Sequence, residues 1–235
     1  MKDTNALAVV FVVLLSLCTS VSPIDAKDPE PPTVQIPEPG VPEILNIQGK
    51  FIRVAYNNEA YVILGYQPAN RSVGEEWMLL EVGITLRDGV PDFILTRGAL
   101  SVDTPDGQTL PLPSISEFRA ANTSALQHRA KVQRDNINYF PPGANAACRL
   151  GFFSDLEDSA AAYDQVELSD YRGCLGRLYF HVPGGIKYGQ HWLNVKFQKS
   201  VLRVPFRILT AEEEKLLSKH YKAISKQVKE AFQKK

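Results

Sequence analysis

The sequence predicts a mainly β protein built as an antiparallel β-sandwich. Short runs of alternating apolar and polar residues recur between residues 51 and 209, a pattern typical of half-buried strands. Turn-forming residues such as Asn57-Asn58 and Thr104-Pro105-Asp106-Gly107 separate these runs at close intervals. Many short strands joined by such turns favour two packed sheets over a helical bundle.

The first 26 residues have the layout of a secretory signal peptide. Lys2 precedes an apolar run from Ala6 to Cys18, and small and polar residues follow up to Ala26. The run is about 13 residues long, whereas a membrane-spanning helix needs roughly 20. We therefore expect export with cleavage after Ala26, or alternatively at the Ser20–Val21 bond.

A lipid anchor at Cys18 is the alternative to a freely released protein. Leu15-Ser16-Leu17-Cys18 resembles a bacterial lipobox, although Leu17 stands where a small residue is usual. Lipidation would place the protein on a membrane, and without it the sequence predicts a periplasmic or secreted protein. The mass of the mature N-terminus distinguishes the two.

Residues 27–45 form a proline-rich linker. Proline interrupts both helices and strand ladders, so the segment favours extended polyproline II structure or disorder. The prolines are Pro29, Pro31, Pro32, Pro37, Pro39 and Pro42.

Cys148 and Cys174 are the two cysteines that remain after signal removal or lipidation. Their separation excludes a CxxC redox or zinc motif, and an exported protein meets an oxidising compartment. We expect a disulfide between them, with two separate buried thiols as the alternative.

The domain from residue 46 to residue 209 contains the predicted strands. Glu75–Leu86 shows the clearest alternation, with Met78, Leu80 and Val82 on its apolar face. Arg87-Asp88-Gly89 should then turn the chain so that Phe93–Val102 returns. The other predicted strands are Phe51–Tyr56, Tyr61–Tyr66, Gln108–Leu112, Val166–Leu168, Cys174–Val182, Gln190–Phe197 and Val201–Leu209.

A helical insertion is predicted near residues 114–134. Ser114 and Glu117 form a capping box, and Asn122-Thr123-Ser124 should divide the segment into two short helices. Ser154 and Glu157 form a second capping box inside the disulfide loop.

A C-terminal amphipathic helix is predicted over residues 210–235. Thr210 and Glu213 form a capping box at its start. Docking of its apolar stripe on the domain is favoured over coiled-coil dimerisation and over binding to a membrane surface. The stripe consists of Leu217, Tyr221, Ile224, Val228 and Phe232.

The sequence contains no GxSxG, HExxH, Walker or GxGxxG motif, so it predicts no cofactor and no catalytic residues. Basic and acidic residues are balanced at 26 each, which gives no overall field to recruit nucleic acid. Metal binding is not expected either. His181 and His191 are expected to flank one hairpin turn, and alternation along its two strands directs His181 outward and His191 inward.

The acidic residues of the disulfide loop are expected to be a solvated surface. They lack the spacing and central glycine of a calcium-binding EF-hand loop. They are Asp155, Glu157, Asp158, Asp164, Glu167 and Asp170.

Two stretches of sequence resemble a known group of proteins. Trp77-Met78-Leu79-Leu80-Glu81-Val82 is followed later by Gly176-Arg177-Leu178-Tyr179-Phe180-His181-Val182-Pro183. This order is similar to that of secreted bacterial immunoglobulin-like domains of uncharacterised function, and the resemblance covers residues 51–209. It implies an immunoglobulin-like β-sandwich without catalytic residues, from which the helical insertion and the disulfide loop depart.

These observations predict an exported, non-catalytic protein that serves as a binding or envelope-assembly module. Its partner would be another protein or an envelope polymer, and its oligomeric state is open. We expect the partner surface at Tyr139, Phe140, Tyr163 and Tyr171, close to the predicted disulfide. The alternative is an extracytoplasmic hydrolase with a polar cleft where the Tyr139–Gly143 loop meets the disulfide loop.

Overall fold

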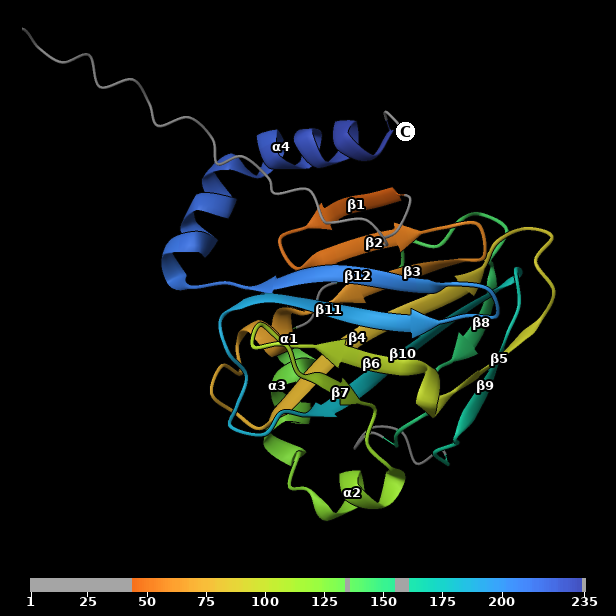
Figure 1. Cartoon of the computed structure of the whole chain (residues 1–235), viewed down its shortest axis with the longest axis horizontal. Helices are drawn as coiled ribbons and strands as arrows, with labels where there is room; N and C mark the ends of the chain where they lie inside the picture. Colours follow the sequence, from red (N-terminus) through yellow and green to blue (C-terminus); the bar gives the residue numbers. More distant parts are fainter. Residues whose placement is uncertain (1–43, 134–135, 155–160, 234–235) are drawn as a thin grey trace, which may run out of the picture. The chain divides into compact units, whose positions relative to one another are not determined.

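The computed structural model describes residues 44–133, 136–154 and 161–233 and shows a mainly β protein with a C-terminal helix (Figure 1). The predicted signal peptide, Cys18 and nearly all of the proline-rich linker lie outside the described residues. The second capping box also falls partly outside them, because Glu157 is not described.

The larger sheet has six strands. Its neighbours pair antiparallel except for the last two, which run parallel. The predicted hairpin at Asn57-Asn58 is confirmed, since Tyr56 pairs with Tyr61 and the Asn57 side chain accepts hydrogen bonds from two turn N–H groups. In spatial order the strands are β1 (Ile44–Gly49), β2 (Ile52–Tyr56), β3 (Ala60–Gly65), β4 (Trp77–Leu86), β10 (Arg172–His181) and β8 (Ala146–Arg149).

The second sheet has four antiparallel strands, in the order β12 (Val201–Ile208), β11 (Gly189–Lys196), β6 (Leu100–Asp103) and β7 (Thr109–Pro111). The predicted turn between β6 and β7 is confirmed. The N–H of Gly107 donates to the carbonyl of Thr104, and Gly107 has a φ of 81°, which glycine adopts without steric cost.

The predicted return strand Phe93–Val102 is wrong as a single element beside β4. A short 3-10 turn at Arg97–Ala99 divides it into β5 (Phe93–Thr96) and β6, which belong to different sheets. The small sheet is formed by β5 and β9 (Gln165–Leu168). Both edges of β4 are already occupied by β3 and β10, so the chain after β4 has no edge there to pair with.

The two larger sheets share one hydrophobic core. Their facing side chains are fully or almost fully buried, and the Tyr66 and Phe206 rings lie 5.4 Å apart across the interface. The core includes Val62, Leu64, Met78, Leu80, Val82, Leu178 and Phe180 from the six-stranded sheet, with Val102, Leu193, Val195, Val204 and Phe206 from the other.

The outer face of the six-stranded sheet is also covered. Alternation predicts that Glu81 and Thr85 lie on the less apolar face of β4, yet both are buried. Phe118 of α2 (Ile115–Ala120) and Phe153 pack on the Tyr179 ring, with centroids 4.6 and 5.3 Å away. Sequence alternation alone could not reveal this second layer, because loop and helix residues distant in the chain supply it.

Short helices connect the strands. The Ser114–Glu117 capping box is confirmed, and the predicted division of the helical insertion is confirmed by a break between α2 and α3 (Ser124–Val132). The four-residue helix α1 (Gln67–Asn70) was not predicted. Its last residue, Asn70, is buried, and its side-chain oxygen accepts a hydrogen bond from the N–H of Leu209 at 2.6 Å.

The C-terminal helix α4 (Ala211–Gln233) docks along β1, at one edge of the six-stranded sheet (Figure 1). Leu217, Ile224 and Val228 are buried. The Tyr221 hydroxyl and the Ser225 hydroxyl both donate to the carbonyl oxygen of Ile47 at 3.3 and 3.4 Å. The helix thereby satisfies an acceptor on the edge strand, and the described part of its apolar stripe packs within the domain, as docking predicts. The Phe232 side chain lies outside the described residues.

Candidate binding surface

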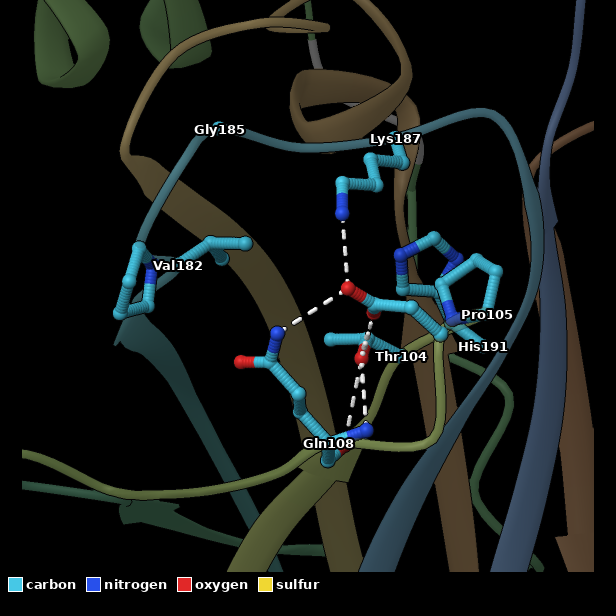
Figure 2. Close-up of a pocket in the computed structure, with 9 residues that line it drawn as sticks. Thr104, Pro105, Gln108, Val182, Gly185, Lys187 and His191 are labelled. Carbon is cyan, nitrogen blue, oxygen red and sulfur yellow. Dashed lines mark hydrogen bonds and ion pairs between the residues drawn. The ribbon is translucent and has the colours of Figure 1, made fainter.

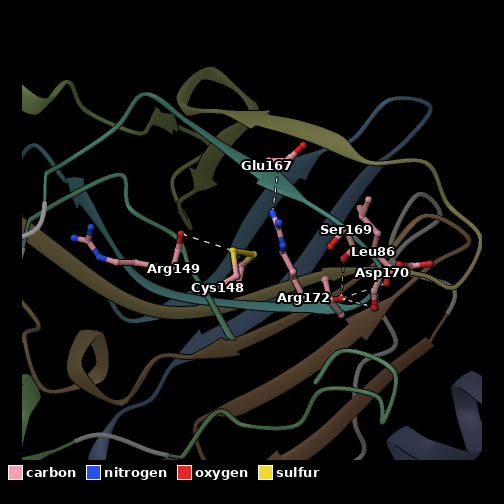
Figure 3. The surroundings of a disulfide bond; sticks show 9 residues. Leu86, Cys148, Arg149, Glu167, Ser169, Asp170 and Arg172 are labelled. Atoms are coloured by element: carbon pink, nitrogen blue, oxygen red, sulfur yellow. Dashed lines mark hydrogen bonds and ion pairs between the residues drawn. A yellow bond between two sulfur atoms is a disulfide. The ribbon is translucent and has the colours of Figure 1, made fainter. Parts of the chain in front are cut away.

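The predicted disulfide is present, and it joins two neighbouring strands. Cys148 in β8 lies directly opposite Cys174 in β10, and the two side chains are bonded. Figure 3 shows the bond beside Arg149 and close to the ion pair between Arg172 and Glu167. The disulfide therefore fixes the edge strand β8 to the sheet.

Arg97 anchors the disulfide loop to the rest of the domain. Its guanidinium donates to the carbonyl oxygens of Pro113 at 2.7 Å and Phe152 at 2.6 Å. It also pairs with the Asp164 carboxylate at 3.0 Å and donates to the Tyr163 carbonyl at 3.2 Å. Arg97 is nearly buried at 12% side-chain exposure, so these bonds hold both arms of the loop in fixed positions.

Arg149 makes a second link between the arms. One of its terminal nitrogens donates to the carbonyl of Phe153 at 2.9 Å, and the other to that of Ala161 at 3.1 Å. These acceptors lie on either side of residues 155–160. The disulfide loop is thus held by a covalent bond and by two guanidinium groups.

Two of the predicted partner residues, Tyr163 and Tyr171, flank the two ends of β8. The carbonyl of Tyr171 accepts the N–H of Ala146 at 2.9 Å, at the start of the strand. The N–H of Tyr163 donates to the carbonyl of Gly151 at 2.7 Å, just beyond its end. The Tyr163 and Tyr171 residues are 57% and 48% exposed. Two accessible rings are therefore carried on backbone that hydrogen bonds hold in place at and just beyond the ends of β8.

The other two predicted residues lie on the segment that crosses the outer face of the six-stranded sheet. Tyr139 is 39% exposed. Phe140 is half-buried, because its ring lies over Gly83 of β4 and Gly173 of β10. We define the β8 surface as β8 with Tyr163 and Tyr171 at its ends.

Sequence reasoning missed β8 itself. The segment Ala146–Arg149 is short and has neither an apolar alternation nor β-branched residues, so nothing local indicates a strand. The available signal was its cysteine, which had to lie next to the strand that carries Cys174 if the disulfide formed.

A small recess lies between the β6–β7 turn and the loop after β10 (Figure 2). At about 10 Å³ it has room for roughly one water molecule. The Asp106 carboxylate there accepts hydrogen bonds from Lys187 at 2.7 Å, Thr104 at 2.5 Å and Gln108 at 3.0 Å. The Lys187 ammonium and the Thr104 hydroxyl hold the pKa of Asp106 well below its usual range. These contacts hold the β6–β7 turn in place, and the recess is too small for an organic ligand.

The two histidines lie as alternation directs. His181 is exposed and its ring lies against that of Trp77, whereas His191 is fully buried and stacks on Phe206. The expectation that they flank one hairpin is wrong, because β10 and β11 belong to different sheets. Burial lowers the pKa of His191. Across the described ranges, no group of three or more His, Cys, Asp or Glu side chains is arranged to hold a metal ion.

The described acidic residues of the disulfide loop make structural contacts. Asp164 pairs with Arg97, Glu167 pairs with Arg172, and Asp170 accepts the N–H of Gly89. The remaining three, Asp155, Glu157 and Asp158, lie outside the described residues.

The hydrolase alternative requires a polar cleft where the Tyr139–Gly143 loop meets the disulfide loop. The two segments meet at the start of β10. The Phe140 ring covers Gly173 there. His181 lies at the opposite end of β10, and His191 lies in the four-stranded sheet, so neither of these two histidines is at the junction.

Comparison with known proteins finds no family model, no curated protein and no solved structure that matches this chain. Of the helices formed by the described residues, none is both long enough and apolar enough to span a bilayer.

Proposed function

We propose that this protein is an exported, non-catalytic binding module that engages a protein or an envelope polymer through the β8 surface. The proposal includes an immunoglobulin-like arrangement of the two sheets. Their antiparallel-rich pairing and their single shared core support that arrangement. The disulfide is compatible with an extracytoplasmic location.

The observation that carries the proposal is the combination of exposure and rigidity at Tyr163 and Tyr171. Tyrosine is enriched in binding interfaces, because it offers a large contact area and a hydroxyl at a low cost in side-chain entropy. Both residues are about half exposed, yet the Tyr171 carbonyl is hydrogen-bonded to the start of β8 and the Tyr163 N–H to Gly151, just beyond its end. A partner would therefore meet a surface that is already ordered, which reduces the entropy lost on binding.

The disulfide and Arg97 explain how this order is maintained in an irregular segment. Arg97 contacts the carbonyl of Tyr163 directly, and the disulfide fixes the strand to which the Tyr171 carbonyl is hydrogen-bonded. These bonds satisfy backbone carbonyls of the irregular segment. They also give a recognition surface the fixed geometry from which binding benefits.

The experiment compares capture of envelope components by three immobilised forms of the full mature chain. The test variant is Tyr163→Ala/Tyr171→Ala. The matched control is Tyr188→Ala/Leu216→Ala, which removes two comparably exposed side chains, 54% and 47%, outside the β8 surface. We expect one captured species to be retained by the wild type and the control and lost from the test variant.

Equal capture by the test variant and the control would overturn the β8 surface as the binding site. Far-UV circular dichroism and the melting temperature of each variant establish that loss of capture does not reflect loss of folding.

A further inference from the structure

Five lysines lie along one face of α4. Their separations are four, three, four and three residues, the spacing that keeps side chains on one side of a helix. All five are exposed. They are Lys215, Lys219, Lys222, Lys226 and Lys229, which we term the lysine face.

The lysine face points away from the domain. Each of the buried residues Leu217, Ile224 and Val228 follows or precedes a lysine by two positions, which is about 200° around the helix axis. Because this apolar stripe is docked on the domain, the lysines on the opposite side are directed into solvent.

The acidic residues of α4 leave this face with a net positive charge. Glu213 is bound by Arg207 and Glu214 by Arg71, both at the start of the helix. Glu212, in the same first turn, is exposed three positions before Lys215. Between residues 215 and 233 the only acidic residue is Glu230, which pairs with Lys226 at 3.8 Å. With Glu212 and Glu230 set against the five lysines, the face keeps a net charge of about +3.

The five lysines of this face lower the stability of the helix that carries them. Like charges three and four positions apart repel and destabilise a helix. The repulsion would be relieved by a ligand that supplies negative charges in a line. From Lys215 to Lys229 the lysine face extends about 21 Å at 1.5 Å per residue.

We propose that the lysine face binds a linear polymer that carries phosphate groups. A linear polyanion matches the row in charge and in shape. An anionic bilayer fits less well, because a helix that lies in a membrane inserts its apolar face, and the apolar stripe of α4 is already buried against the domain. This surface is at the β1 edge of the six-stranded sheet and does not depend on the β8 surface at the other edge.

The test uses inorganic polyphosphate as the probe and measures its affinity for the full mature chain at several salt concentrations. Each neutralised phosphate should contribute about 0.7 to 0.9 to the slope of log affinity against log salt, so five contacts predict a slope of about −4. The variant Lys222→Gln/Lys226→Gln/Lys229→Gln removes three of these contacts, so on the same slope it should bind roughly a hundredfold more weakly at about 0.15 M salt.

The matched control is Arg119→Gln/Lys196→Gln/Lys199→Gln. It removes the same charge from three exposed residues outside α4. We expect it to bind within about threefold of the wild type. Equal weakening in both triple variants would show that net charge and not the lysine face is responsible, and would overturn the proposal.

Two further outcomes would also overturn it. One is the absence of salt-sensitive polyphosphate binding by the wild type. The other is binding to vesicles containing phosphatidylglycerol without binding to polyphosphate, which would identify a membrane surface instead. Melting temperatures of the variants should match or exceed that of the wild type, since fewer like charges repel along the helix.

Discussion

Cys148 lies directly opposite Cys174 in the parallel pair of β8 and β10, so the disulfide connects adjacent strands as well as closing the loop between them. β8 is only four residues long and forms the last strand of the sheet. A strand this short has few backbone hydrogen bonds to hold it in the sheet. The disulfide adds a covalent attachment to the neighbouring strand.

Removal of the disulfide should destabilise the protein substantially. For the Cys148→Ala/Cys174→Ala variant, the entropy regained by the unfolded chain predicts a loss of about 3.5 kcal/mol in the free energy of unfolding. Urea unfolding under non-reducing conditions measures this loss. The wild type in reductant serves as the control and should approach the variant. An unchanged urea midpoint in the variant would contradict the structural role of the bond.

The contact between Phe140 and Gly173 allows a double-mutant test of how the 136–140 segment is attached. A Cβ atom on Gly173 would lie 2.8 to 3.1 Å from atoms of the Phe140 ring. We therefore expect Gly173→Ala to cost roughly 1–3 kcal/mol through overpacking. The cost should largely disappear in the Phe140→Ala background, because the obstructing ring is absent. Chemical denaturation of the four proteins of the cycle gives the coupling energy, and strict additivity would contradict this contact.

The sequence predicted best those elements whose signals are local. The Asn57-Asn58 turn, the Ser114–Glu117 box and the Thr210–Glu213 box each satisfy backbone groups a few residues away, so their consequences are readable from adjacent residues. The amphipathic stripe of α4 likewise predicted docking, although it did not indicate that β1 would be the docking site.

Strand partners could not be predicted in this way. Nothing near Trp77–Leu86 shows that β10, almost 90 residues later, takes the edge that Phe93–Val102 was expected to occupy. The candidate surface was predicted in part: Tyr163 and Tyr171 are exposed, but β8 between them was unrecognised. Phe140 illustrates the limit, because its packing depends on glycines in two distant strands.

Asn70 should be essential for the junction between α1 and the end of β12. Its side chain is buried and accepts the N–H of Leu209. Asn70→Ala leaves that N–H without its acceptor, which should cost about 1–3 kcal/mol. The thermal midpoint should fall accordingly, while Gln198→Ala, an exposed amide, should leave it nearly unchanged. A wild-type midpoint for Asn70→Ala would mean that water replaces the lost acceptor.

His191 should make the protein less stable as the pH falls from 7 to 5. Burial lowers the pKa of this imidazole in the folded protein, and the Gly189 carbonyl and the Asp106 carboxylate offset only part of that effect. Below about pH 6.5 the unfolded chain binds a proton at this residue and the folded protein does not, so acidification favours unfolding. The loss begins near the unfolded pKa and continues down to the lowered pKa of the folded state.

The measurement is the free energy of unfolding at pH 7, 6 and 5 for the wild type and for His191→Phe. Phenylalanine preserves an aromatic ring beside Phe206 and cannot be protonated, so its stability should change less over this range. His181→Asn, which removes a half-exposed imidazole, is the control and should follow the wild type. The carboxylates with lowered pKa, among them Glu213 and Glu214, lose their contribution only at more acidic pH. The carboxylates therefore act in a lower pH range than His191. If the free energy of unfolding changed equally with pH in the wild type and in His191→Phe between pH 7 and 5, His191 would be excluded as the source of the acid sensitivity.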